Sequence, residues 1–94
     1  MRCFLVCYDI SCPKRWRSIF KIMKTYGEPW QYSVFFCRLR QIDRVRMEND
    51  LRLHLNNSED RLLICDLGCD EGSALESITA LGAQPLKSER ISVL

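Results

Sequence analysis

The sequence lacks an apolar run of the roughly 18 residues that a helix needs to cross a bilayer. No secretory-type cleavage site follows its apolar start, MRCFLVCYDI. We therefore expect no membrane partner and interpret this start as a buried strand. The sequence also lacks a Cys-x-x-Cys pair, and its single histidine, His54, is not near a cysteine in the chain. A zinc site of the usual spacing is therefore not expected.

Cysteine is nevertheless frequent, with six residues in a short chain. Because no secretory signal accompanies them, we expect small buried thiols in a reducing, cytoplasmic compartment rather than a disulfide framework. Catalysis by Cys12 or Cys37 is not expected, since neither has a histidine nearby in the sequence. The segment GCDEG, residues 68–72, lacks the glycine spacing of a P-loop and the ligand spacing of an EF-hand, so we predict a turn.

Length and composition are typical of one soluble globular domain spanning residues 1–94, with 47% hydrophobic and 28% charged residues. The net charge of +2 does not by itself indicate nucleic-acid binding, but the distribution of charge is uneven. Between Lys14 and Lys24 there are five basic residues and no acid. A basic surface on the element that contains them is therefore expected.

Hydrophobic patterning predicts alternating strands and helices. The start of the chain and residues 61–67 resemble buried strands, Pro13 and Gly27 delimit a helix, and a short third helix is expected at 73–81. The expected elements are strands at 2–8, 30–39 and 61–67, helices at 13–26, 42–55 and 73–81, and one or two short edge strands within 84–94.

This order favours an α/β (α+β) two-layer sandwich, and the ferredoxin-like βαββαβ arrangement is the obvious candidate. That arrangement needs a hairpin in the middle of the chain, yet residues 28–39 contain no Asn-Gly or Asp-Gly turn. They supply either two short strands or one bent strand. With the helices assigned to one face of the sheet, none is left for the other face, and a homodimer is expected to cover it.

Asp9 follows the first apolar strand, where a carboxylate has no role in packing. It is either an ordinary turn or helix-capping residue, or a metal ligand at the end of a central strand. Magnesium prefers oxygen ligands and keeps several waters, so one or two carboxylates suffice. A single aspartate makes a poor site, whereas two copies of Asp9 at a dimer axis make a plausible one.

The predicted helix after Pro13 has an apolar stripe and, roughly opposite, a basic stripe. The basic stripe is either an ordinary solvated face or a surface for a phosphate backbone. Its members are Lys14, Arg17, Lys21 and Lys24. Several aromatic residues are either core residues or platforms that stack on bases. They are Tyr8, Trp16, Trp30, Tyr32 and Phe35.

Three segments together carry a family resemblance. They are LVCYDIS at 5–11, a basic helix that ends in Tyr-Gly at 26–27, and QYSVFFCRL at 31–39. This combination resembles the second CRISPR-associated (Cas) protein family, the small subunit of the spacer-acquisition machinery. The similarity covers residues 3–39 and continues weakly through the second helix and the strand DRLLICDL.

The resemblance implies a ferredoxin-like homodimer with an extra C-terminal strand, a role that the terminal ISVL could fill. It also implies a magnesium-dependent endonuclease of RNA or DNA, or a non-catalytic dimer that bridges two dimers of the CRISPR integrase. Asp9 matches the family's metal-binding aspartate and Tyr8 its tyrosine neighbour. Ser33 and Phe35 match the Ser-Val-Phe element. The chain departs from the family at Trp16, Pro29 and Phe36.

Two functions follow as expectations. In the first, paired Asp9 carboxylates hold Mg²⁺ or another divalent cation such as Mn²⁺, Arg15 or Arg17 orients the phosphate, and the Tyr8 and Phe35 side chains shape the pocket. In the second, the dimer is an adaptor that presents the basic stripe to duplex DNA and to the integrase subunit. A toxin-like RNA-cleaving protein of related fold is a more distant alternative.

Overall fold

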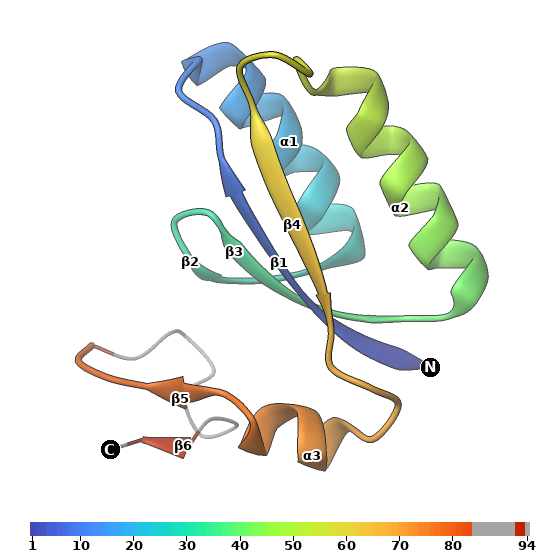
Figure 1. Ribbon diagram of the computed structural model, residues 1–94, viewed down its shortest axis with the longest axis vertical. Helices are drawn as coiled ribbons and strands as arrows, with labels where there is room; N and C mark the ends of the chain where they lie inside the picture. The colour runs from blue at the N-terminus through green and yellow to red at the C-terminus, as the bar shows by residue number, and fades with distance from the viewer. Residues whose placement is uncertain (84–91, 94) are drawn as a thin grey trace.

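A computed structural model describes residues 1–83 and 92–93 (Figure 1). Strands and helices alternate along most of the chain, and the strands form a main sheet and a small second sheet. The elements are β1 Arg2–Asp9, α1 Pro13–Tyr26, β2 Gly27–Gln31, β3 Val34–Leu39, α2 Gln41–His54, β4 Arg61–Asp66, α3 Glu71–Glu76, β5 Thr79–Ala80 and β6 Ser92–Val93. Of the segment 84–94, where one or two short edge strands are predicted, residues 92–93 form β6, and the other residues lie outside the described part of the chain.

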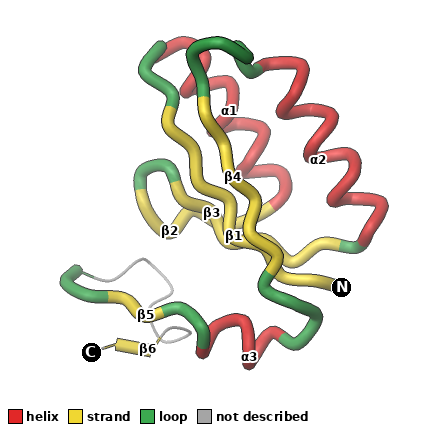
Figure 2. The backbone as a smooth tube through the Cα atoms, viewed as in Figure 1, coloured by secondary structure: helices red, strands yellow, loops and turns green. Residues whose placement is uncertain are grey.

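The main sheet has the strand order β2-β3-β1-β4, and every neighbouring pair is antiparallel (Figure 2). The mixed α/β class is therefore confirmed. In the short second sheet, β5 and β6 pair in parallel. No helix in the described part of the chain is both long and apolar enough to span a membrane.

Residues 28–39 form two strands, which settles the alternative that the sequence left open. The hairpin turns at Tyr32 and Ser33, and among the described residues no residue other than glycine has a positive φ. The turn therefore does not need the Asn-Gly or Asp-Gly pair that the sequence lacks. Gly27 is required for a different reason, since a Cβ there would lie 2.5 Å from both Cys37 Sγ and the Phe36 carbonyl oxygen.

The larger core lies between the sheet and the helices α1 and α2. Successive residues of a strand point to opposite faces, so β1 places Phe4, Val6 and Tyr8 on the helix side. There they meet Ile19 and Met23 of α1 and other buried side chains. The remaining members of this core include Phe35, Cys37, Leu39, Met47 and Leu51.

The opposite face of the sheet is partly covered, and the prediction that no helix is left for it is wrong. Ala74 of α3 is buried against Cys3, Trp30 and Phe36, which belong to three different strands. The short helix begins before the predicted Ser73 because Asp70 caps it, with its Oδ2 accepting hydrogen bonds from the Ser73 backbone N–H at 3.0 Å and hydroxyl at 2.6 Å.

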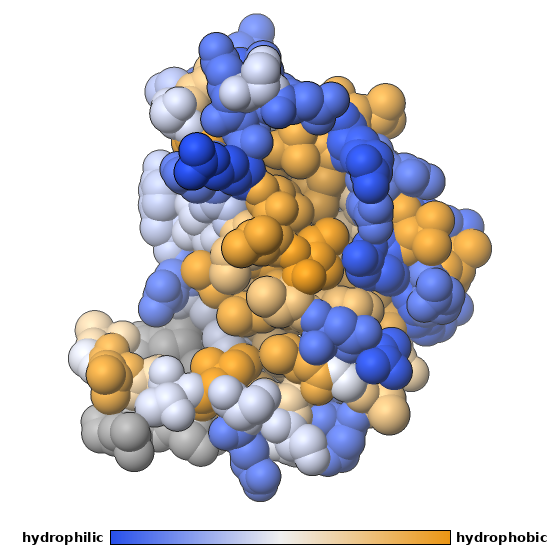
Figure 3. All heavy atoms as spheres, viewed as in Figure 1, coloured by the Kyte–Doolittle hydropathy of each residue, from blue (hydrophilic) through white to orange (hydrophobic). Residues whose placement is uncertain are grey.

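The same helix also ends earlier than predicted, at Glu76 rather than Leu81. Ser77 closes it, with its hydroxyl donating to the Ala74 carbonyl at 2.7 Å, and β5 begins at Thr79. Part of the sheet face stays open beyond α3. Leu63 of β4 is 67% exposed there, and hydrophobic side chains gather over β1 and β4 in this view (Figure 3). A partner can cover this remaining surface.

Candidate functional site

Asp9 is the last residue of β1 and pairs with Arg61 of β4 across the sheet. The alternation along β1 places Asp9 on the same face as Cys7, away from α1 and α2. Asp9 is exposed, and an open hollow of about 240 Å³ lies beside it. The lining residues are Cys7, Tyr8, Asp9, Arg61, Leu62 and Leu63. The carboxylate therefore stands at the rim of the open sheet face.

The described residues of one chain do not complete a metal site around this carboxylate. Within residues 1–83 and 92–93, no group of three or more His, Cys, Asp or Glu side chains is arranged to hold a metal ion. The carboxylate oxygens of Asp9 have the hard-donor chemistry that Mg²⁺ and Mn²⁺ prefer. A second copy of Asp9 is the simplest source of a further protein ligand.

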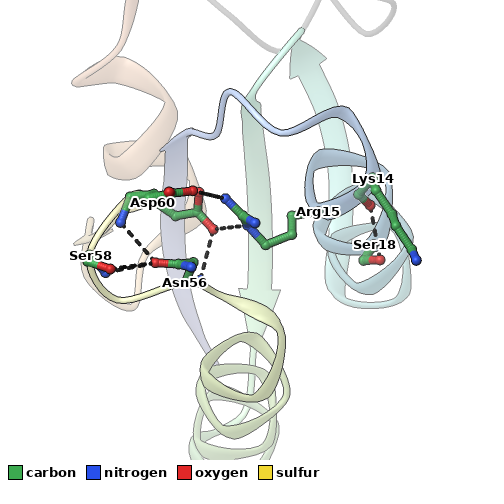
Figure 4. A network of polar contacts seen from close by, with 7 residues as sticks. Lys14, Arg15, Ser18, Asn56, Ser58 and Asp60 are labelled. Carbon is green, nitrogen blue, oxygen red and sulfur yellow. Dashed lines mark hydrogen bonds and ion pairs between the residues drawn. The ribbon is translucent and has the colours of Figure 1, made fainter.

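Arg15 extends from α1 toward the loop that precedes β4 (Figure 4). Its Nε donates to Asp60 Oδ2 at 2.9 Å, and a terminal nitrogen donates to Glu59 Oε1 at 2.8 Å. The Asp60 side chain is 0% exposed and also accepts the Asn56 backbone N–H at 2.9 Å. The guanidinium holds the pKa of Asp60 below its usual range, mainly through this side-chain hydrogen bond.

These contacts give Arg15 a structural role that sequence reasoning missed. The loop residue Asn56 also orders the same turn, since its Oδ1 accepts hydrogen bonds from Ser58 and from the Glu59 backbone (Figure 4). Arg15 thus ties α1 to the turn that leads into β4, the strand that carries Arg61. The two acids that Arg15 contacts, Glu59 and Asp60, lie in the polar segment NNSED. Apart from its negative charge, nothing in this segment indicates that it binds an arginine far away in the sequence.

Tyr8 and Phe35 belong to the core on the helix side of the sheet, opposite to the face of Asp9, although Tyr8 also lines the hollow beside Asp9. Phe35 is 0% exposed, and its ring stacks near Tyr8 with centroids 6.3 Å apart. The Tyr8 hydroxyl is buried and has no hydrogen-bond partner within the part of the chain that the structure describes. Burial, with a smaller contribution from Tyr32, raises the pKa of Tyr8 to about 12.

Ser33 occupies the β2–β3 turn, close to the end of β1. Its carbonyl accepts the Tyr8 backbone N–H at 3.0 Å, and its hydroxyl accepts the Trp16 indole N–H at 2.9 Å. Ser33 therefore joins β1, α1 and the hairpin at the end of the sheet that carries Asp9. These bonds define a positioning role for Ser33.

The basic stripe is present on α1 as the helical spacing predicts, and all four side chains are exposed. Its members are Lys14, Arg17, Lys21 and Lys24. In contrast to Arg15, the Arg17 side chain has no acidic partner in the described part of the chain. Arg17 is thus the arginine of the predicted pair that remains free for a phosphate.

An aromatic stack borders this stripe, and we name Tyr32, Trp16 and Phe20 the aromatic ladder. The ring centroids of Tyr32 and Trp16 are 4.4 Å apart, and those of Trp16 and Phe20 are 5.0 Å apart. Helical spacing pairs Trp16 with Phe20 in the sequence. Nothing local pairs Trp16 with Tyr32, because the hairpin that brings them together is a tertiary feature.

The sequence and the fold are similar to those of known proteins. A sequence model described as CRISPR associated protein Cas2 matches residues 1–72. The chain is 44% identical over 77 residues to the CRISPR-associated endoribonuclease Cas2 1 of Rhodospirillum rubrum, covering 80% of this chain and 76% of that protein. It is 45% identical over 65 residues to the CRISPR-associated endoribonuclease Cas2 of Geobacter sulfurreducens, covering 69% and 68%.

A solved structure shows the same similarity. The fold matches the crystal structure of Streptococcus pyogenes Cas2 with a TM-score of 0.70 and 27% sequence identity, covering 81% of this chain and 98% of that one.

Proposed function

This chain belongs to the CRISPR-associated protein Cas2 family, and from that premise we propose that it is a metal-dependent endonuclease that hydrolyses phosphodiesters of RNA or DNA during spacer acquisition. The observation that carries the proposal is Asp9 at the end of β1, exposed on the open face of the sheet. The names of the Rhodospirillum and Geobacter relatives, which call them endoribonucleases, support the nuclease class.

The active unit in this proposal is a homodimer with a ferredoxin-like fold. The element order βαββαβ and the sheet order β2-β3-β1-β4 support that fold. The open sheet surface around Leu63 is apolar and lies beside Asp9. Burying this surface against a second copy removes apolar area from water and brings two Asp9 carboxylates toward a common axis.

In the proposed site the two Asp9 carboxylates hold a divalent cation, Mg²⁺ or Mn²⁺. When bound, such a cation would offset the negative charge of the phosphodiester and would lower the pKa of a water molecule. Arg17 binds and orients the phosphate from the exposed side of α1. Arg15 and Ser33 act as positioning residues, while Tyr8 and Phe35 support the end of β1 from the core.

Cleavage is expected to require both a divalent cation and the dimer. Purified protein should cut labelled RNA or DNA oligonucleotides in the presence of Mg²⁺ or Mn²⁺, and excess EDTA should abolish the products. Sedimentation velocity on the same samples should show a dimer at concentrations where cleavage occurs. Activity that persists in EDTA, or that belongs to the monomer, would contradict the proposed mechanism.

A second candidate function is a non-catalytic dimeric adaptor that binds duplex DNA and bridges CRISPR integrase dimers. The specific observation that favours it is the exposed basic stripe, which no acidic residue of α1 interrupts. In this role the four cations bind phosphates and release counterions, whereas Asp9 is dispensable. Both functions are compatible with one protein.

Neutralising the basic stripe is expected to weaken duplex DNA binding and to flatten its salt dependence. Each lost phosphate contact lowers the slope of log Kd against log salt by roughly one unit, so glutamine at all four positions should lower it by up to about four. Fluorescence anisotropy at several salt concentrations measures this slope. Arg46→Gln on α2, also an exposed cation, is the control and should leave the slope within about one unit. An unchanged slope in the fourfold variant would exclude the stripe as a DNA surface.

A further inference from the structure

The aromatic ladder has a free end at Tyr32. This residue lies in the tight β2–β3 turn and is 75% exposed, although its ring stacks on Trp16 with an interplanar angle of 15°. Stacking covers one face of a ring, so an exposure this high leaves the other face open to solvent.

The ladder is held in place before any ligand arrives. The Trp16 indole N–H donates to Ser33 Oγ at 2.9 Å, which fixes the plane of the central ring. Below it, Phe20 is parallel to Trp16 within 16° and contacts the buried Phe35 edge-on at 5.4 Å. A rigid platform of this kind loses little conformational entropy when a further ring is added.

The ladder also adjoins the basic stripe. At about 100° per residue, Trp16 and Phe20 lie on the flank of α1 next to Arg17 and Lys24. The Lys24 ammonium lies 5.6 Å from the centroid of the Phe20 ring, a direct contact between the two surfaces. Alternating cations and flat rings are the combination with which proteins bind single-stranded nucleic acid, since phosphates take the cations and bases take the rings.

We propose that the free face of Tyr32 stacks on an unpaired base of a nucleic acid whose backbone lies along the basic stripe of α1. This inference rests on the proposed function and deepens it, because it assigns the binding surface to single-stranded segments or splayed duplex ends. Bases inside a duplex are stacked on both faces and present no free face to Tyr32, so a blunt duplex offers only the outer face of each terminal pair. The ladder accepts any base, since every base has a π face.

The test compares Tyr32→Leu with Tyr32→Phe, which keeps a ring of nearly the same size. Both are exposed-site changes and should leave the melting temperature within about 3 °C of the parent. Anisotropy in EDTA, which prevents cleavage, is measured with four fluorescein-labelled probes of matched sequence: single-stranded RNA, single-stranded DNA, a duplex with a five-nucleotide 3′ overhang, and the blunt duplex.

Tyr32→Leu should weaken binding of the single-stranded and overhang probes by about 5- to 100-fold, the range for loss of one base–aromatic stack. Binding of the blunt duplex should stay within twofold, and the salt slope should be unchanged, because no phosphate contact is lost. Tyr32→Phe should bind every probe as the parent does. An RNA-only or DNA-only loss would identify which unpaired strand uses the platform and would support the proposal.

Three results would overturn it, and they are distinguishable. If the parent binds these probes but Tyr32→Leu binds all of them equally well, the stacking platform is excluded while the proposed function stands. If Tyr32→Leu weakens the blunt duplex as much as the overhang, Tyr32 does not select unpaired bases. A parent protein that binds none of the probes would refute both the platform and the proposed function.

Discussion

Replacing Asp9 by alanine is expected to reduce metal-dependent cleavage of RNA or DNA by about 10²- to 10³-fold, the order of loss when a group that stabilises the transition state is removed. The variant removes two carboxylates from the dimer at once, and nothing else in the described residues offers a replacement cluster. Initial rates at saturating Mg²⁺ or Mn²⁺ measure the effect. The fold should be unaffected, because Asp9 is exposed.

Two control variants test whether Asp9 acts as a metal ligand or whether any exposed acid has the same effect. Asp9→Asn keeps the size of the side chain but weakens its affinity for a cation, so it should be almost as inactive as the alanine variant. Glu76→Ala, which removes an exposed acid from α3, should cleave at the parental rate. A fully active Asp9→Ala dimer would end the catalytic proposal and leave the adaptor function.

Mixed dimers extend the test to the shared site. When parent and Asp9→Ala subunits are combined in equal amounts and allowed to exchange, random pairing gives about one quarter parental dimers. If each site needs Asp9 from both copies, activity should fall to about this fraction. Activity near one half would mean that each subunit cleaves independently.

Replacing Phe35 by alanine is expected to lower the free energy of unfolding by about 3–5 kcal/mol, the usual effect of deleting a buried aromatic side chain. A domain of this length has only about 5–14 kcal/mol in total. At about 4–8 °C per kcal/mol, the melting temperature should fall by at least about 12 °C. Phe35 is 0% exposed and packs against Tyr8 and Phe20, which explains the size of the effect.

The Phe35 variants also decide between a structural and a catalytic role for this residue. Phe35→Leu retains most of the apolar volume and should cost less than about 1.5 kcal/mol. Thermal unfolding followed by circular dichroism measures both changes, and cleavage is assayed well below each melting temperature. Parental stability of Phe35→Ala combined with lost cleavage would show that the ring acts at the site instead of in the core.

The sequence was most informative where the signal is local. Apolar periodicity placed α2 within one residue of its observed bounds, and Pro13 with Gly27 delimited α1. The apolar pattern also indicated that the first strand ends next to Asp9, which is the last residue of β1 in the structure. It was less informative for residues 28–39, because a turn without positive φ needs no glycine and so leaves no glycine in the sequence to mark it. It was also less informative for α3, because Asp70 and not Ser73 caps this short helix.

The sequence by itself therefore determined the positions of β1, α1, α2 and β4, the basic stripe of α1 and the isolation of Asp9 at the end of an apolar strand. These features depend on residues within a few positions of one another. Only the tertiary structure decided that Arg15 binds Asp60, that Phe35 and Asp9 lie on opposite faces, and that Tyr32 stacks on Trp16. Each of these contacts joins segments that are distant in the sequence and meet only when the sheet forms. The physical reason is that strand register and packing decide which side chains become partners, whereas spacing along the chain does not.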